Sequence, residues 1–433
     1  MKPDLPTLWA CATGHRSDPL TGVRRLLGAV ALGGLMLLGV LMLAGCRRPP
    51  LLYDVTLAPD RITPNADGDT DITKITYKLG RSATLSIYFL DAEGQRHDFR
   101  RHEPRAPGEY EVYFGGVIND RMLPDGTYTW VIEAVDSQGE QAQVQGTLVI
   151  ADADTVFPDI QELTVYPPVF TPNRDGLLDR ATISLYLAKD AQLQVYLVNP
   201  EDPNRVRYAV AETEGLRKPG ERGRHEYDYD AGVDQGAEPP PDGTYWVVAE
   251  AVDAVGQRDV ETTTLTIREG GVPKAEILSP PDGDSVRWNT DHVLLGNTLC
   301  FTVTVDNYGP VPIRTSGPPP GTVYRDDQNY NTLGYGIEAG AWRVGIESEA
   351  SLSSYPYRWA VGEPSQLVTR VINGQVYTYL PAGARGRVYG CIKITQEPVP
   401  NPLYFWAGLI HERVGIAPIN NHVDPEFVTI EVP

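Results

Sequence analysis

The sequence feature that most constrains the possible folds of this chain is an internal duplication. Thr63–Gly68, with the sequence TPNADG, recurs 108 positions later as Thr171–Gly176, with the sequence TPNRDG. Pro124–Tyr128, with the sequence PDGTY, recurs 117 positions later as Pro241–Tyr245, so the second copy has gained nine residues between these motifs. Because single domains commonly have about 100–150 residues, a repeat at this distance predicts two domains of one fold in tandem.

Both copies have the sequence pattern of β-strands. Polar and apolar side chains alternate over residues 72–79 and 83–90 and over the corresponding residues 181–187 and 191–198, which is typical of half-buried strands. The Pro-Asp-Gly-Thr-Tyr motif predicts a turn that leads into a strand, because proline presets φ and glycine supplies positive φ. No stretch of a dozen residues keeps a helical period. About seven short strands in about 105 residues predict an all-β fold, an Ig-like β-sandwich, in each copy.

The two copies resemble the Ig-like domain of flagellar hook-capping proteins, a module also used in exported bacterial proteins outside flagella. The resemblance rests on the Thr-Pro-Asn-x-Asp-Gly motif, on an Ile-x-Tyr-x-Leu or Ile-x-Leu-x-Leu strand, and on Pro-Asp-Gly-Thr-Tyr with its later Ala-Val-Asp. It implies two tandem Ig-like β-sandwiches, over residues 55–155 and 156–270. The tandem arrangement departs from hook-capping proteins, so the resemblance implies a fold and not that role.

Residues 271–433 differ from the two repeats. Leu299–Gly309 is an alternating strand that leads into an Asn/Gly turn, and Pro381–Ile394 repeats this pattern. The layout resembles CARDB-type and related Ig-like domains, which implies a third Ig-like β-sandwich with long loops. The polar loop over residues 310–335 is the longest of them, and loops of this length inside a compact domain are often functional.

Residues 1–45 have the organisation of a lipoprotein signal peptide. Two arginines precede an uncharged apolar run over residues 26–44, and the sequence LAGC ends at Cys46. This tetrapeptide resembles the bacterial lipobox, which implies a diacylglyceryl group on the Cys46 sulfur and cleavage before Cys46. The alternative is an uncleaved membrane helix, since about 20 apolar residues span a bilayer. Both place the rest of the chain outside the cytoplasm, and the lipobox makes residues 46–54 a lipidated tether at the extracytoplasmic face of the cell membrane.

The charge of the chain limits its partners. The formal net charge is −20, and it becomes −22 without residues 1–45, which carry four basic and two acidic residues. Such a charge disfavours nucleic acid and anionic membrane surfaces and favours solubility and cation binding.

Two cysteines remain outside the signal peptide and the lipidation site. Cys300 and Cys391 both lie in predicted strands of the last third of the chain, and in an oxidising compartment such a pair usually forms a disulfide. Closing a loop of about 90 residues would stabilise that domain by up to about 4–5 kcal/mol on the chain-entropy model. The alternative is two buried free thiols.

A cluster of oxygen ligands in the first repeat suggests calcium as a cofactor. Asn65, Asp67, Asp69 and Asp71 stand at every second position around a glycine, and calcium prefers six to eight oxygen ligands. The second repeat has Leu177 in place of the third of these residues, so a site there would be poorer. The alternative is an Asx-rich turn in which the carboxylates accept hydrogen bonds from backbone amides.

The aromatic residues of the third domain suggest a ligand-binding face. Tyr355, Tyr357 and Trp359 form the densest cluster, and Asp326 and Asn329 lie in the long loop. Aromatic rings stack on the apolar faces of sugars, while carboxylates and amides bond hydroxyl groups. The alternative is core packing, because a sandwich of this size needs large inward-facing residues.

The sequence contains no catalytic motif for a metalloprotease, a serine hydrolase, a phosphate-binding loop or a dithiol site. We therefore expect a non-enzymatic, membrane-anchored extracytoplasmic lipoprotein that acts as a structural or adhesive scaffold and presents its last domain on an Ig-like stalk. Its partner would be a protein or polysaccharide of the cell envelope. The alternative is a carbohydrate-binding surface protein that acts through the aromatic-rich last domain.

Overall fold

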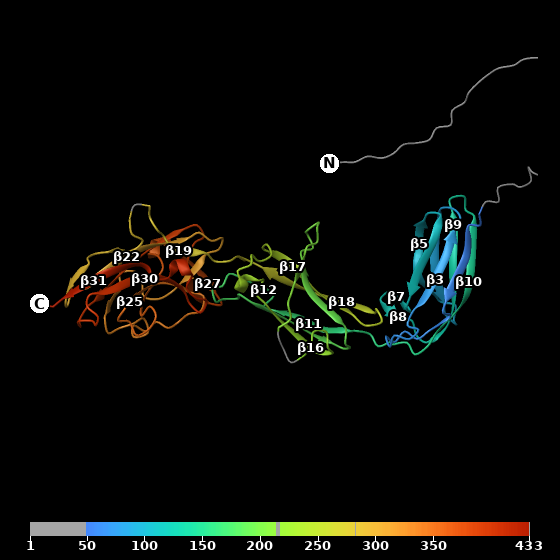
Figure 1. The fold of residues 1–433 in the computed structure, drawn as a ribbon, viewed down its shortest axis with the longest axis horizontal. Helices are drawn as coiled ribbons and strands as arrows, with labels where there is room; N and C mark the ends of the chain where they lie inside the picture. Colours follow the sequence, from blue (N-terminus) through green and yellow to red (C-terminus); the bar gives the residue numbers. More distant parts are fainter. Residues whose placement is uncertain (1–48, 214–216, 282, 433) are drawn as a thin grey trace, which may run out of the picture.

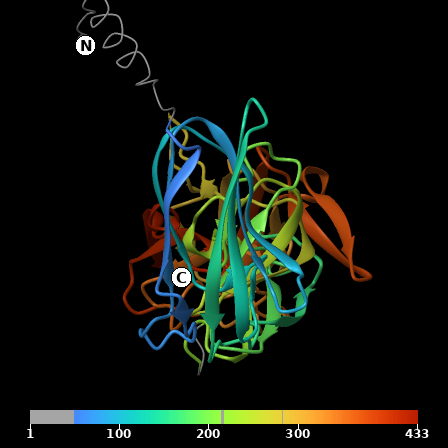
Figure 2. The same ribbon diagram turned by 90° about the vertical axis from the view of Figure 1, so that its right-hand side faces the viewer.

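The computed structural model describes residues 49–213, 217–281 and 283–432. These residues form 31 strands and three one-turn 3-10 helices, which confirms the prediction of an all-β chain. Figure 1 shows three β-rich units that follow one another along the chain, and Figure 2 looks along the row from the first unit. None of the helices in the described part is long and apolar enough to cross a membrane.

The first unit is a sandwich of a three-stranded and a five-stranded sheet. Alternate residues of each strand face the space between the sheets, as in β3, where Ile75, Tyr77 and Leu79 are buried. The smaller sheet has the order β1 (Leu52–Ala58), β3 (Thr73–Leu79) and β6 (Gly108–Phe114). The larger has the order β2 (Arg61–Ile62), β10 (Gln141–Ile150), β9 (Gly126–Asp136), β4 (Ala83–Leu90) and β5 (Arg96–Arg105), and a separate hairpin is formed by β7 (Val117–Ile118) and β8 (Arg121–Met122).

The second unit repeats this topology. One sheet has the order β11 (Ile160–Tyr166), β13 (Ala181–Leu187) and β16 (Gly223–Tyr229). The other has the order β12 (Val169–Phe170), β18 (Arg258–Ile267), β17 (Gly243–Val252), β14 (Gln192–Val198) and β15 (Arg207–Ala209), and the helix η1 (Val233–Gln235) follows β16. The duplication in the sequence is therefore also a duplication of strand order.

The repeated Pro-Asp-Gly-Thr-Tyr motif closes each sandwich in the same way. The Tyr128 hydroxyl donates to the carbonyl oxygen of Pro124 at 2.8 Å, and the corresponding bond of the second unit is 2.6 Å long. The Asp125 carboxylate accepts hydrogen bonds from the backbone amides of Asp152 and Ala153, where the chain leaves the unit. In the second unit the equivalent carboxylate binds the amides of residues 269 and 270. The motif thus fixes the direction in which the chain exits each repeat.

The third unit is a larger sandwich. One sheet has the order β19 (Ala275–Ile277), β22 (Thr298–Asn307), β29 (Arg385–Lys393) and β24 (Val323–Arg325), with β20 (Arg287–Trp288) also paired to β22. The opposing sheet has the order β21 (His292–Leu294), β31 (Val423–Glu431), β30 (Leu403–His411), β25 (Trp342–Ser348), β23 (Ile313–Thr315), β28 (Gln375–Leu380) and β27 (Val368–Ile372), with β26 (Tyr357–Ala360) also paired to β25. The helices η2 (Pro364–Gln366) and η3 (Pro418–Asn420) lie in its loops.

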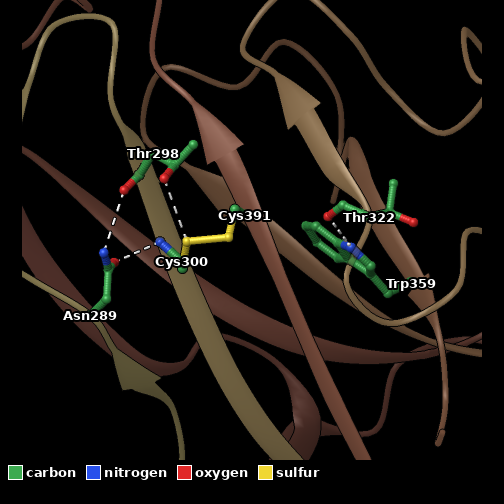
Figure 3. Close-up of a disulfide and its surroundings, with 6 residues drawn as sticks. All are labelled: Asn289, Thr298, Cys300, Thr322, Trp359 and Cys391. Carbon is green, nitrogen blue, oxygen red and sulfur yellow. Dashed lines mark hydrogen bonds between the residues drawn. A yellow bond between two sulfur atoms is a disulfide. The ribbon is translucent and has the colours of Figure 1, made fainter.

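The predicted disulfide is confirmed. Cys300 on β22 and Cys391 on β29 face each other in the register of two neighbouring antiparallel strands, so the bond joins strands of one sheet. Nearby, the fully buried Trp359 donates its indole N–H to the carbonyl oxygen of Thr322 at 3.0 Å (Figure 3). The Trp359 ring lies against Gly390, where a Cβ atom would overlap it.

One glutamine and one lysine make the main side-chain contacts at the junction between the first and second units, and the backbone N–H of Arg258 also donates to the carbonyl oxygen of Asp120 at 3.1 Å. The Gln257 side chain accepts the backbone N–H of Met122 at 3.1 Å and donates to the carbonyl oxygen of Val156 at 2.8 Å. The Lys189 ammonium group pairs with Asp154 of the linker at 2.7 Å and with the buried Asp253 at 2.6 Å. The second unit therefore holds both the β7–β8 hairpin of the first unit and the linker between the two units.

The junction between the second and third units is made by the second copy of the repeated loop. The Asp175 carboxylate accepts the hydroxyl of Tyr379 at 2.8 Å, and its backbone carbonyl accepts the Arg314 side chain at 2.6 Å. Two glycines bring the backbones into direct contact, because a Cβ atom at Gly176 would overlap the carbonyl of residue 339, and one at Gly340 would overlap Asp175. The Thr171–Gly176 loop of the second unit is thus also the main contact with the third unit.

We predict that Gly176→Ala weakens this junction, whereas Gly68→Ala does not affect it. Both glycines have φ between 80° and 90°, so both substitutions strain the backbone to a similar extent, but no atom lies within 4 Å of a Cβ at Gly68. Limited proteolysis of the full chain should show faster cleavage between residues 268 and 274 for Gly176→Ala, and small-angle scattering should show a wider spread of shapes. Equal cleavage rates and scattering for the two variants would contradict the proposed role of this loop in the junction.

We also predict that His411 makes the second junction sensitive to acid. His411 is buried, stacks on Trp342 with ring centroids 4.3 Å apart, and its Nε2 lies 2.8 Å from the carbonyl oxygen of Arg174. A carbonyl oxygen only accepts, so Nε2 carries a proton in the neutral ring. Burial lowers the pKa of His411 to about 4. The contribution of the buried neutral His411 to the stability of the folded chain is therefore complete above the ordinary histidine pKa of about 6.5. It is lost as the pH falls from there towards 4, because the unfolded chain takes up a proton on His411 before the folded chain does.

Between pH 7 and pH 4.5, we expect His411 to lower the free energy of unfolding by about 2–3 kcal/mol. Burial and the nearby Asp175 raise the pKa of Asp179 to about 6, which adds stability as the pH falls below 6 and opposes the histidine effect. The measurement is therefore the free energy of unfolding of the full chain, obtained from denaturant unfolding at pH 7 and pH 4.5. Its change between the two pH values is compared for the wild type and His411→Gln. The variant should lose less stability on acidification, and parallel pH profiles would refute the assignment.

Candidate functional site

The end of the third unit opposite the second junction carries a cleft. Strands β24, β25 and β29 end at this edge, and β30 begins there, so the loops that follow Arg325, Ser348 and Lys393 meet beside Leu403. The cleft has a volume of about 400 Å³. Its lining includes oxygen-bearing side chains and apolar or aromatic ones, namely Asp326, Asp327, Gln328, Asn329, Ser348, Ser351, Ser353, Gln396 and Glu397 with the exposed Leu352 and the buried Tyr357, Leu403 and Phe405.

Asp326 shapes the cleft. Its carboxylate accepts the backbone amides of Thr395 and Gln396 at 2.6 and 2.9 Å and the Thr395 hydroxyl at 2.5 Å. Its backbone carbonyl accepts the hydroxyl of Tyr357 at 3.0 Å. Asp326 therefore ties the loop after β24 to the loop after β29, and burial raises the pKa of Tyr357 to about 12, which keeps this hydroxyl a donor.

Asn329 also acts on the loop itself. Its side-chain oxygen accepts the backbone amides of Asn331 and Thr332, each at 3.0 Å. The sequence prediction thus named three residues that line the cleft, Asp326, Asn329 and Tyr357, and the structure uses polar atoms of all three to build its wall. Ser353, Gln396 and Glu397 line the same cleft.

The chemistry of the lining favours neutral or cationic ligands. Among the described residues that line the cleft, none is Lys or Arg. Asp327 of the lining pairs with Arg325 at 2.9 Å, and Glu397 adds a negative charge. An anionic ligand would find no basic side chain in the lining, whereas hydroxyl, amide and ammonium groups would find acceptors there. The apolar side chains of Leu403 and Phe405 in the lining add a surface for the nonpolar part of a ligand.

Two of the predicted ligand-binding residues do not reach the surface, and for these the prediction is wrong. Trp359 is fully buried in the main core, because alternation along β26 points it and Tyr357 between the sheets. Tyr355 is 1% exposed and lies over the outer face of the sheet, against Gly345 and Gly408, with its hydroxyl 2.6 Å from Asn421. The core-packing alternative describes both rings.

The exposed aromatic pair of the third unit was not predicted. Tyr404 on β30 and Phe427 on β31 are register partners, are 42% and 48% exposed, and have ring centroids 4.8 Å apart. They lie at the same end of the unit as the cleft, since Leu403 begins β30 there. Strand alternation is the sequence signal that could have found Tyr404. Because Leu403 and Phe405 face inward, the residue between them faces outward.

Three of the four predicted calcium ligands, Asn65, Asp67 and Asp71, act as side-chain acceptors for their own loop. The Asp71 carboxylate accepts three backbone amides at 2.9–3.1 Å, from Asn65, Ala66 and Gly68. The Asn65 side chain accepts the Asp67 amide at 3.0 Å, and the Asp67 carboxylate accepts the Asp69 amide at 2.9 Å. This is the Asx-rich turn that the sequence left open. The described part of the chain holds no group of three or more His, Cys, Asp or Glu side chains placed to bind a metal ion, and calcium stays a prediction.

The third unit also contains a buried charge cluster that the sequence did not reveal. Glu412 is 3% exposed and pairs with Arg358 at 2.7 Å and with the fully buried Arg343 at 3.2 Å. The Arg343 side chain also donates to the carbonyl oxygen of Ser316 at 2.8 Å. Because an unpaired buried charge costs several kcal/mol, this cluster constrains how the loops around the second junction pack.

No family model matches the chain, and no curated protein matches it. Among solved structures, it is similar to an adhesin described as Ca²⁺-stabilized that "helps an Antarctic bacterium reach out and bind ice", with 14% identity, coverage of 88% of this chain and 74% of that chain, and a TM-score of 0.21. It is also similar to the glycan-utilisation protein SGBP-B of Bacteroides ovatus, solved with a mixed-linkage heptasaccharide, with 13% identity, coverage of 86% and 65%, and a TM-score of 0.15. At TM-scores this low, neither likeness bears on the function of this chain.

Proposed function

We propose that this protein is a non-enzymatic extracytoplasmic lipoprotein, held to the cell membrane by lipid on Cys46, that acts as a scaffold and presents the cleft of its third unit to a partner in the envelope. Cys46 and the apolar run before it lie outside the described residues, so the anchor rests on the sequence. The observation that carries the proposal is the position of the cleft, at the far end of the third unit from the junctions that link it to Cys46.

The two junctions support a scaffold rather than a flexible string. Each is made by named side chains that reach across, Gln257 and Lys189 at the first and Arg314 and Tyr379 at the second. The exits of both repeats are also held by carboxylate–amide bonds. Such contacts limit bending between units, so the cleft is kept away from the tethered end.

A carbohydrate-binding surface protein is the second candidate function. The features that favour it are the oxygen-rich lining of the cleft, which holds no basic residue among the described ones, and the exposed pair of Tyr404 and Phe427. Neutral sugars combine hydroxyl groups with apolar ring faces, and such ligands would use both features.

The anchor is tested by Cys46→Ala. We expect the variant to lose its acyl mass and to leave the membrane fraction, because the sulfur that accepts the lipid is gone. Cys11→Ala is the matched control, since this cysteine lies before the predicted cleavage site and its loss should change neither property. Mass spectrometry and membrane fractionation give the two readouts, and an unchanged membrane fraction for Cys46→Ala would remove the anchor from the proposal.

The cleft is tested by Leu352→Arg and Gln396→Arg in the full chain. The Leu352 side chain is fully exposed at the cleft, so an arginine there should fill the cleft without disturbing the fold. We expect each variant to bind isolated envelope protein or polysaccharide at least about 10-fold more weakly, a loss of about 1.4 kcal/mol. Val371→Arg, on an exposed residue of β27 away from the cleft, is the control.

Binding in the polysaccharide fraction would favour the carbohydrate-binding candidate, and binding in the protein fraction would favour the scaffold with a protein partner. If both cleft variants bind as well as Val371→Arg, the cleft is not the contact site.

A further inference from the structure

The chain enters the first unit only three residues after Cys46, so the tether predicted over residues 46–54 is too long, because β1 already begins at Leu52. The backbone N–H of Gly80 donates to the carbonyl oxygen of Leu51 at 3.2 Å, and the Arg81 side chain donates to that of Pro49 at 3.3 Å, so the chain is fixed from Pro49 onward. Between Cys46 and Pro49 the sequence has only Arg47 and Arg48. Even fully extended, three residue steps span about 10–11 Å.

The turns at this end of the first unit form one surface, which we call the base. It consists of the entering chain at residues 49–50 and the turns at residues 80–82, 105–108 and 136–140, which join strands that all end at this side. Its exposed side chains are small or polar, among them Ser82, Ala106, Pro107, Ser137 and Gln138.

Part of the equivalent surface of the second unit contacts the first unit and the linker, whereas its turn at residues 217–222 is largely exposed. Lys189 and Gln257 of the second unit correspond in the repeat to Arg81 and Glu140, and they hold the linker and the β7–β8 hairpin. In the first unit Arg81 keeps the same role, since it pairs with Asp136 and Glu140 and bonds the entering chain. The base is thus the copy of a surface that the second repeat uses for docking.

The charge of the base differs from that of the rest of the chain. Arg81 pairs with Asp136 and Glu140, and Arg105 pairs with Glu103, so these five side chains carry a formal charge of −1. The two arginines after Cys46 bring this end to +1, whereas the formal net charge of residues 46–433 is −22. The whole chain is therefore repelled by an anionic surface, but this end is not. Basic residues close to an anionic membrane contribute about 1 kcal/mol each.

We infer that the base rests directly on the lipid headgroups, in contact with phosphate-bearing lipids, and that the tether is too short to let the first unit leave them. This inference depends on the proposed anchor at Cys46. The headgroup layer is about 5–8 Å thick on each side of the bilayer, and the tether is barely longer than that. The base of the first unit would therefore contact the membrane, just as the equivalent surface of the second unit contacts the first unit.

The test uses the full lipidated chain in vesicles of phosphatidylethanolamine and phosphatidylglycerol with a quencher on the headgroup. A fluorophore is placed on Ser137→Cys, on Ser82→Cys as a second base position, and on Leu352→Cys at the cleft, while Cys300 and Cys391 are protected in their disulfide. We expect quenching at both base positions at least threefold stronger than at the cleft. A 20-residue Gly/Ser insertion between Arg48 and Pro49 should reduce base quenching to the cleft level while the protein still floats with the vesicles.

The outcomes separate this inference from the proposed anchor. Protein that floats with vesicles but shows equal quenching at Ser137, Ser82 and Leu352 would overturn the inference and leave the anchor intact. Base quenching that survives the insertion would mean that the short tether is not its cause, which also overturns the inference. Protein that does not float at all would overturn the anchor and the inference together.

Discussion

The arrangement of this protein depends on what a carboxylate needs when it is buried. Asp175 is 4% exposed, and burial raises its pKa, so its position is stable only because donors surround it. Tyr379 of the third unit supplies one donor, and the Leu177 amide of its own loop supplies another. The first repeat has the same loop with Asp67, but there the carboxylate is exposed and bonds only within the loop. One sequence motif thus serves as a simple turn in one repeat and as a docking element in the next.

The β-architecture of the repeats could be predicted because it is written in local patterns. Alternation of apolar residues gives the strands, and Pro-Asp-Gly-Thr-Tyr gives a turn whose tyrosine bonds back to its own proline, a contact over four residues. The disulfide could be predicted as well, since only two cysteines were left to pair. These features require no knowledge of which strand lies beside which.

The candidate site could be predicted only in part, because it is assembled from distant loops. Asp326 reaches the cleft through its bonds to residue 395, and nothing near Asp326 in the sequence announces that contact. Tyr355, Tyr357 and Trp359 lie together in the sequence, but strand pairing sends Trp359 into the core and Tyr355 to the outer face. The junction residues Arg314 and His411 are similar cases, since the groups they bind lie more than 130 positions away.

The disulfide has a mechanical consequence if the chain, as proposed, links a membrane to an external partner. Because Cys300 and Cys391 are 91 positions apart, they enclose strands β23 to β28 in a covalent ring. If tension drew the third unit out from its two ends, the enclosed segment could not lengthen, and roughly 300 Å of potential extension at about 3.3–3.6 Å per residue would be withheld. A pulled chain would therefore yield mainly through the first and second units, neither of which has a crosslink among its described residues.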